Sequence, residues 1–189
     1  TANNYSYSGF RVTQLANEEL QWEVSENLNA GIEFRFFDRL YGELNYFEKG
    51  SSQLLFRLPL PQSTGIGEIY QNTGAMVNKG VEGRLGYDII RTENLRWNLE
   101  LTATTFSNEF TELPFEERIV GSKQWKVGKS LYDYYIRDFA GVDPDNGDAL
   151  YWKDILDGEG NPTGEREKTN NYSEADRYYV GTAIPDLTG

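Results

Sequence analysis

Strict alternation of apolar and polar side chains over residues 77–90 constrains the fold of this chain more than any other feature. The stretch reads V-N-K-G-V-E-G-R-L-G-Y-D-I-I. One set of alternate positions holds the apolar residues Val81, Leu85, Tyr87 and Ile89. The other set holds the charged residues Glu82, Arg84 and Asp88. A period of two residues predicts a β-strand with one apolar and one charged face. The apolar face then meets either a protein core or lipid, and the pattern fits both.

The same pattern recurs along the first half of the chain. We predict four amphipathic strands, over about 22–37, 41–49, 76–90 and 97–107. The breaks at 38–40 and 91–96 are short, so each predicts an antiparallel hairpin. The connections at 59–75 and after residue 108 are longer. Alternating short and long connections are typical of an outer-membrane barrel, although a soluble antiparallel sheet with one wet face fits this pattern slightly better.

Other stretches are less regular. Residues 50–58 either extend the second strand or form a separate short one. Pro59 and Pro61 cannot donate to a central ladder, so they mark the end of this stretch. The stretch 61–74 that follows is interpreted as a loop. Beyond about residue 109, turn-forming clusters dominate, and short strands are predicted near 117–127 and 133–139.

Composition excludes several classes of function. The chain has 30 acidic and 18 basic residues and a formal net charge of -12. Nucleic acid is excluded as a partner, because a phosphate backbone requires a basic surface. The absence of His and Cys rules out Ser-His-Asp and Cys-His catalysis, His-containing zinc sites and disulfides. No apolar run reaches the ~18 residues of a membrane helix, but transmembrane strands are invisible to that test.

Short phrases of the sequence resemble, in the same order, those of SusC/RagA-type TonB-dependent transporters. The phrases are L-A-N-E-E-L-Q-W-E (15–23), F-D-R-L-Y-G-E-L-N-Y-F-E-K (37–49), L-P-L-P-Q-S-T-G (58–65), N-T-G-A-M-V-N-K-G-V-E (72–82), L-R-W-N-L-E-L-T-A-T (95–104), R-D-F-A-G-V-D-P-D-N-G-D-A-L-Y (137–151) and A-D-R-Y-Y-V-G-T-A-I-P-D (175–186). Each phrase is short, but their combination is specific. Glu18 and Ala149 stand where the family usually has Pro.

The resemblance implies an all-β fold, with antiparallel strands of a large transmembrane β-barrel and long outer loops. Residues 1–108 would supply wall strands with short inner turns, and residues 109–189 a long outer excursion with short strands, both within one larger barrel domain. The chain would be a fragment, because barrels of this type have ~22 strands and four strands cannot close one. The apolar faces would meet outer-membrane lipid, and the charged faces the wet lumen.

The resemblance also implies a function, the active import of oligosaccharides or peptides across the bacterial outer membrane. Import would be driven by a TonB complex that contacts parts of the protein outside these 189 residues, and a SusD-like surface lipoprotein would close the outer mouth. No residue is assigned to covalent chemistry, so the chain is predicted not to be an enzyme and to need no cofactor. A soluble extracellular β-domain that binds glycans through exposed aromatics is the alternative.

Aromatic side chains of the second half are the candidate ligand-binding residues, because aromatic rings offer flat apolar surface to sugar rings. They are Trp125, Tyr132, Tyr134, Tyr135, Tyr151 and Trp152. The competing and favoured explanation is that these rings pack the excursion against its own barrel or form an interfacial girdle.

Asp143, Asp145 and Asp148 are the candidate metal ligands. Their spacing in D-P-D-N-G-D resembles the opening of a calcium-binding loop. Asp154 stands where such a loop carries a bidentate Glu, and no flanking helices are predicted. A β-turn that uses Asp, Asn and Gly for their backbone tolerance is the competing and favoured interpretation.

Overall fold

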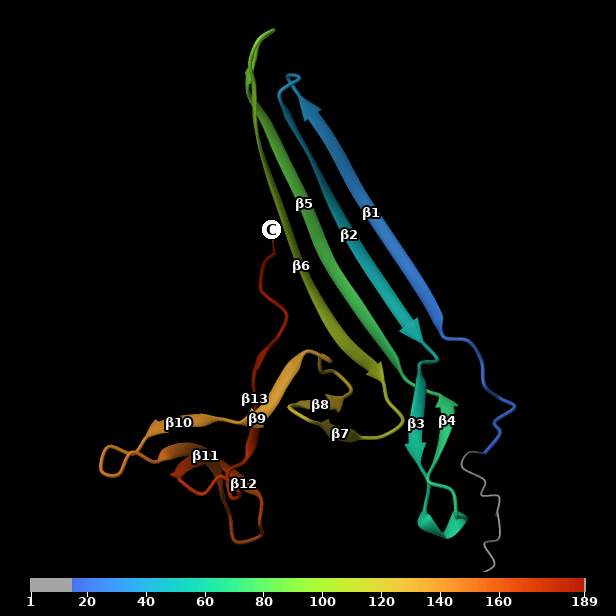
Figure 1. Ribbon diagram of the computed structural model, residues 1–189, viewed down its shortest axis with the longest axis vertical. Helices are drawn as coiled ribbons and strands as arrows, with labels where there is room; N and C mark the ends of the chain where they lie inside the picture. Colours follow the sequence, from blue (N-terminus) through green and yellow to red (C-terminus); the bar gives the residue numbers. More distant parts are fainter. Residues whose placement is uncertain (1–14, 189) are drawn as a thin grey trace, which may run out of the picture.

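A tall antiparallel sheet of four strands dominates the computed structural model, which describes residues 15–188 (Figure 1). The strands lie in the order β1 (Val24–Phe36), β2 (Leu40–Ser52), β5 (Ala75–Arg91) and β6 (Arg96–Glu112). Turns at 37–39 and 92–95 join them in antiparallel pairs. The predicted all-β class, the four strands and both hairpins are thus confirmed. The sheet is open, with β1 and β6 at its edges.

The register brings the apolar residues of all four strands to one face. Residues directly opposite one another in antiparallel strands share a face, and one such row runs Ile32, Leu44, Gly83, Ala103. We call the larger members of these rows the apolar face: Ala30, Ile32, Phe34, Phe36, Leu40, Leu44, Tyr46, Val81, Leu85, Tyr87, Leu99 and Leu101. The alternate residues form the polar face: Glu33, Arg35, Tyr41, Glu43, Asn45, Glu82, Arg84, Asn98, Glu100 and Thr102.

A separate hairpin stands at the end of the sheet away from the turns. It pairs β3 (Leu55–Pro59) with β4 (Glu68–Asn72), and a 3-10 helix, η1 (Gln62–Thr64), lies between them. The interpretation of 61–74 as a loop is therefore wrong for 68–72, where pairing with β3 overrides a local sequence that lacks alternation. Within residues 15–188, no helix is long and apolar enough to cross a membrane.

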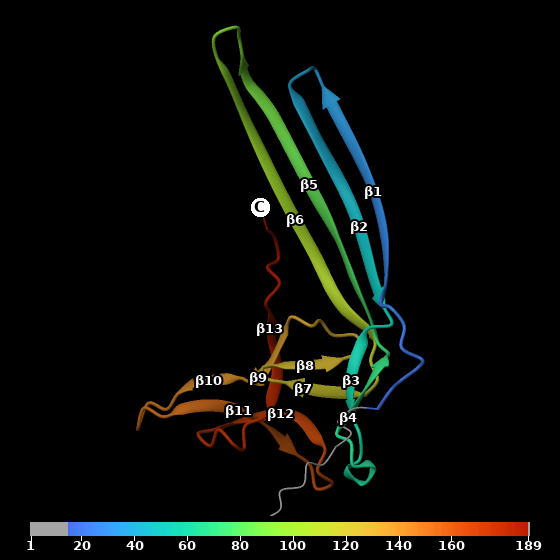
Figure 2. The ribbon, with the colours of Figure 1, turned by 45° about the vertical axis from the view of Figure 1, so that its right-hand side comes forward.

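Two small sheets form the segment 113–187, which we call the excursion. One sheet has the order β13 (Arg177–Thr182), β9 (Asp133–Arg137), β8 (Lys123–Lys126) and β7 (Glu117–Val120). The other has the order β10 (Phe139–Val142), β11 (Ala149–Leu156) and β12 (Pro162–Thr169). Both sheets gather at the end of the long sheet that carries β3 and β4 (Figures 1 and 2). The predicted short strands near 117–127 and 133–139 are present.

The core within residues 15–188 is small and lies where the excursion meets the long sheet. Phe110 at the end of β6 is only 2% exposed. The ring centroid of Trp125 lies 6.0 Å from that of Phe110 and 6.0 Å from that of Phe56 on β3. Phe115 meets Phe56 edge-on, also at 6.0 Å. These four rings join the β3–β4 hairpin, the long sheet and the excursion.

The chain returns twice to the free edge of β6, once within the excursion and once just after it. Phe110 donates its N–H to the carbonyl of Lys129 at 3.0 Å, and Gly128 donates to the carbonyl of Phe110 at 2.9 Å. Farther along the same strand, Thr104 and Thr188 exchange main-chain hydrogen bonds of 2.7 and 2.9 Å. Both contacts use backbone groups. The edge of β6 thus holds the base of the excursion at residues 128–129 and the segment after β13 at Thr188.

Candidate functional site

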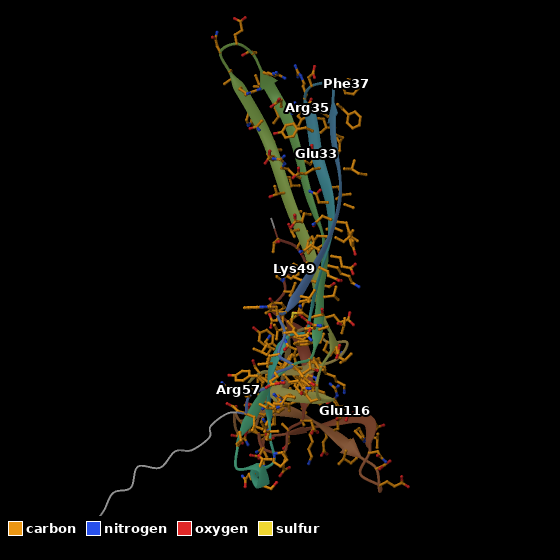
Figure 3. The ribbon with its side chains drawn as sticks, turned by 90° about the vertical axis from the view of Figure 1, so that its right-hand side faces the viewer. Glu33, Arg35, Phe37, Lys49, Arg57 and Glu116 are labelled. Carbon is orange, nitrogen blue, oxygen red and sulfur yellow. The ribbon has the colours of Figure 1, made fainter. Side chains whose placement is uncertain are left out.

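The polar face is crossed by contacts between charged and aromatic side chains near the turns, in the region where Figure 3 labels Glu33 and Arg35. Arg84 Nε lies 3.4 Å from Glu43 Oε1 on the neighbouring strand. The guanidinium of Arg35 lies 5.1 Å from the ring centroid of Tyr41. The hydroxyl of Tyr41 donates to Glu100 Oε2 at 3.2 Å and so reaches across β5. Such a half-exposed network of paired charges is suited to a water-filled space.

Glycines of β5 let aromatic rings lie flat on the polar face. A Cβ added at Gly86 would clash with the ring of Tyr41, and one at Gly80 would lie 2.7 Å from Phe47 Cζ. Gly83 points to the other face, where a Cβ would have no neighbour closer than 3.8 Å. Gly86 is therefore required by the close approach of a ring from β2, and Gly80 by the Phe47 ring together with Thr105 O and Phe106 Cβ on β6.

The apolar face is exposed along its whole length. Ile32 is 69% exposed, Leu101 67% and Leu99 63%. No element within residues 15–188 covers this face, since both small sheets lie at the end of the long sheet away from its turns (Figures 1 and 2). Exposed apolar surface costs ~25 cal/mol per Å² in water, and a patch this continuous marks a contact with lipid or another protein.

Trp125 is part of the small core rather than an open platform. It lies on β8 between Phe56 and Phe110, as described above, and is only partly exposed. Its neighbour Gln124 points to the other face of β8, is 4% exposed and accepts a hydrogen bond of 2.7 Å from the hydroxyl of Tyr179. Burial raises the pKa of Tyr179.

The three tyrosines at 132–135 do not form one surface. Tyr132 and Tyr134 are 40% and 38% exposed. The ammonium of Lys123 lies 3.6 Å from the ring centroid of Tyr134 and donates to the carbonyl of Tyr132. Tyr135 points to the opposite side of β9, where its ring centroid lies 5.0 Å from that of Tyr179.

Tyr151 and Trp152 lie on β11, apart from the other candidates. Tyr151 meets Phe139 and Tyr172 edge-on, with centroid distances of 6.2 and 5.1 Å. The ammonium of Lys168 lies 5.5 Å from the ring of Trp152. The six candidate aromatics are thus divided among several local clusters, and no chain of ring contacts within residues 15–188 joins all of them.

Sequence reasoning missed a polar cluster that ties the two small sheets together. The hydroxyl of Tyr178 on β13 donates to Asp154 Oδ1 on β11 at 2.8 Å. Arg166 on β12 lies over the ring of Tyr178, 3.9 Å from its centroid. Asp176 Oδ2 accepts the N–H of Asp154 at 2.8 Å. Burial, followed by the hydrogen bond to Asp154, raises the pKa of Tyr178 well above its usual range. These residues lie far apart in sequence and share no local pattern.

The candidate metal ligands lie in the turn between β10 and β11. Asp143 Oδ1 accepts the N–H of Asp145 at 2.9 Å, and the N–H of Asp143 donates to the carbonyl of Asp148 at 2.8 Å. Asp148 Oδ2 accepts from the side chains of Asn146 and Asn170. Among residues 15–188, no group of three His, Cys, Asp or Glu is placed to hold a metal ion.

A long antiparallel sheet with one exposed apolar face and one charged face has the pattern of the wall of a membrane β-barrel. The family model described as TonB dependent receptor-like, beta-barrel, matches residues 1–186. The chain therefore belongs to this family. Members of the family are TonB-dependent receptors and transporters, and SusC/RagA-type relatives are outer-membrane proteins.

Several relatives support the same assignment. The chain is 28% identical to TonB-dependent receptor P3 of Formosa agariphila, over 96% of this chain and 20% of that protein. It is 33% identical to TonB-dependent receptor P39 of the same organism, over 69% and 13%. It is 31% identical to TonB-dependent receptor SusC of Bacteroides thetaiotaomicron, over 51% and 10%. The chain thus spans a fifth or less of these relatives.

Solved structures show the same fold. The RagAB peptide importer in its 'open-open' state matches with a TM-score of 0.80 at 24% identity, over 100% of this chain and 21% of that chain. The RagAB peptide transporter matches with a TM-score of 0.78 at 24% identity, again over 100% and 21%. The predicted resemblance to SusC/RagA-type TonB-dependent transporters, with the chain as a fragment of the barrel, is confirmed.

Proposed function

We propose that this chain supplies four wall strands and an outer excursion to an outer-membrane transporter that imports oligosaccharides or peptides with energy from a TonB complex. The observation that carries the proposal is the continuous exposed apolar face opposite a continuous polar face. Lipid would cover the first and water in the lumen would wet the second. The polar cluster of Arg35, Tyr41 and Glu100 would then line the lumen near the inner turns.

The dimensions of the apolar face support a membrane position. Charged residues bound this face: Glu48 and Lys79 lie opposite each other at the outer end, and Arg91 and Arg96 at the inner end. From Lys79 to Arg91 the strand covers about 40 Å at ~3.3 Å per residue. A tilt of ~40° reduces this span to ~30 Å of height, close to the thickness of the hydrocarbon core.

Partner and substrate are proposed from the relatives. The solved relatives carry the name RagAB peptide importer, and SusC is a TonB-dependent receptor. We infer a SusD-like surface lipoprotein at the outer mouth, where the excursion lies. The substrate class is either oligosaccharide or peptide, and contacts with the TonB complex would be made outside these residues.

The test uses the full-length protein that contains this chain. We expect it to fractionate with the outer membrane and to migrate differently on gels before and after heating, as folded barrels do. Uptake of labelled oligosaccharides and peptides would then be compared in cells with and without TonB. Uptake that is unchanged by loss of TonB, or a protein that is soluble without detergent, would overturn the proposal.

The second candidate is a soluble β-domain that binds glycans through its aromatics. It requires the apolar face to be packed against protein, whereas Leu101 and Ile32 are 67% and 69% exposed. It also requires open aromatic platforms, and Trp125 is packed between Phe56 and Phe110. A monomeric, cooperatively folding preparation of these 189 residues in plain buffer would favour this candidate.

A further inference from the structure

Phe37, at the tip of the β1–β2 turn, adopts a backbone conformation that is unfavourable for its residue type. Arg39 donates its N–H to the carbonyl of Phe36 at 3.1 Å and closes a β-turn. The two central residues, Phe37 and Asp38, both have positive φ, 50° and 56°. This combination defines a type I′ turn, which strongly favours Asn and Gly. A bulky aromatic residue at positive φ is a genuine outlier.

Contacts with β5 hold this turn in place. Asp88 donates its N–H to the carbonyl of Arg39 at 2.9 Å. Arg91 donates from its guanidinium to the carbonyl of Asp38 at 3.3 Å. Strained backbone persists where its surroundings determine it in this way, and it concentrates at functional positions. Contacts with β5 therefore fix the conformation of the turn and the position of the side chain at residue 37.

The side chain presented there is a phenyl ring that is 95% exposed (Figure 3). Burial within residues 15–188 does not offset the unfavourable conformation. A smaller polar residue would suit both the turn geometry and water. The ring must therefore gain its stabilisation from a contact outside this part of the chain.

The surroundings of Phe37 indicate what that contact is. The inner end of the apolar face carries other exposed aromatic rings, with Trp97 56% and Tyr87 44% exposed. Three exposed arginines stand at the two inner turns, Arg39, Arg91 and Arg96. They outnumber the acids of the same turns, Asp38 and Glu93, although the whole chain carries a net charge of -12. Aromatic rings and arginines together suit the boundary between acyl chains and phosphate headgroups.

We propose that Phe37 is a membrane anchor, held out on a strained turn so that its ring enters the phospholipid headgroup layer at the inner surface, with the turn arginines contacting lipid phosphates. This inference rests on the proposed function, because it requires the apolar face to meet lipid. It adds a specific lipid contact by a turn residue to the general lipid contact of the strands.

The first test measures membrane depth in the full-length transporter, reconstituted in vesicles of phosphatidylethanolamine and phosphatidylglycerol. A spin label is attached at Phe37→Cys, at Leu101→Cys on the apolar face and at Asp145→Cys in an outer turn. We expect the label at 101 to collide more with oxygen than with a water-soluble nickel complex, the label at 145 to show the reverse, and the label at 37 to give an oxygen-to-nickel collision ratio between these two.

The outcomes separate the anchor from the proposed function. A label at 37 that behaves like the label at 145, or that is shielded from both probes by protein, overturns the anchor while leaving a lipid-exposed Leu101 and the transporter intact. A label at Leu101 that is exposed to water overturns both.

A second variant, Phe37→Asn, is expected to change the thermal midpoint in opposite directions with and without a lipid contact at Phe37. Asn suits positive φ and should raise the thermal midpoint if Phe37 has no partner. Under the proposal, the midpoint in the same vesicles falls by a few degrees instead. An unchanged or higher midpoint in vesicles would overturn the anchor.

Discussion

The ring of Tyr41 on β2 lies flat across Gly86 on β5, at a separation that leaves no room for a Cβ atom. From this position its hydroxyl reaches Glu100 on β6 at 3.2 Å. One side chain thus connects three strands at the end of the polar face near the turns. The contact depends on glycine at position 86, because any larger residue would push the ring away from the sheet.

Gly86→Ala should therefore destabilise the folded protein, by about 1–3 kcal/mol as for other overpacked positions. The reason is the clash with Tyr41, which breaks the contact with Glu100. Denaturant unfolding of the full-length protein in vesicles would measure the change. Gly83→Ala is the matched control on the same strand, since its Cβ would meet only ordinary contact at 3.8 Å. Equal losses in both variants would contradict the close-approach explanation.

Leu101→Arg should cost about 2–4 kcal/mol, the range for an arginine near the middle of the lipid-facing surface of a barrel. Leu101 lies opposite Leu85, halfway between the charged ends of the apolar face. Its chain neighbour Thr102 points to the polar face, so Thr102→Arg should be tolerated. Folding yields into lipid vesicles would be compared for the two variants. A tolerated Leu101→Arg would show that lipid does not cover this face.

Trp125→Ala should destabilise the base of the excursion by about 3 kcal/mol, because it removes a large ring from the small core. Phe56→Ala should have a similar effect, and the two changes should be strongly non-additive because the rings touch. Proteolytic cleavage within 113–187 would report the loss. Additive effects, or a loss of ligand binding with unchanged protease resistance, would assign Trp125 to binding instead.

The raised pKa of the Tyr178 hydroxyl predicts that the folded protein loses stability at alkaline pH. Its pKa in the folded state lies above the usual value of 10.0, so its contribution is fully present below pH 10.0 and is lost as the pH rises through the folded value. Tyr178→Phe should flatten this dependence. Hydrogen exchange of β11 and β13, measured from neutral to strongly alkaline pH, would test it. An identical pH dependence in the variant would contradict the assignment.

Asp143→Asn should leave the β10–β11 turn intact, because an amide oxygen can accept the same N–H of Asp145. If the turn is only a turn, calcium should not change its protease resistance in either protein. A calcium-dependent gain that is present in the unchanged protein and lost in Asp143→Asn would instead establish Asp143, Asp145 and Asp148 as ligands.

The strands of the long sheet could be predicted because their signal is local. In β6, Leu99 and Leu101 alternate with Asn98 and Glu100, and this pattern alone defines strand and face. β4 carried no such signal: its sequence E-I-Y-Q-N gains strand geometry from pairing with β3. Local alternation thus predicts a strand only where one face is consistently apolar.

Contacts between distant residues could not be predicted in the same way. Phe56 and Trp125 form one core although 69 positions separate them, and neither stands in an alternating segment. The aromatic candidates rest on residue type alone, which does not distinguish a ring packed like Trp125 from an exposed one like Phe37. Phe37 gave no signal at all, because its unusual φ is imposed by contacts with β5.

The attachment of the excursion to β6 has a consequence for evolution. The chain leaves the strand at Glu112, and residues 128–129 and Thr188 dock on the edge of the same strand through main-chain hydrogen bonds. Because these bonds do not depend on side-chain identity, the sequence between residue 129 and Thr188 can lengthen, shorten or be exchanged while the main-chain attachment to β6 is kept. The four-stranded sheet can thus serve as a constant framework while the surface built on it changes.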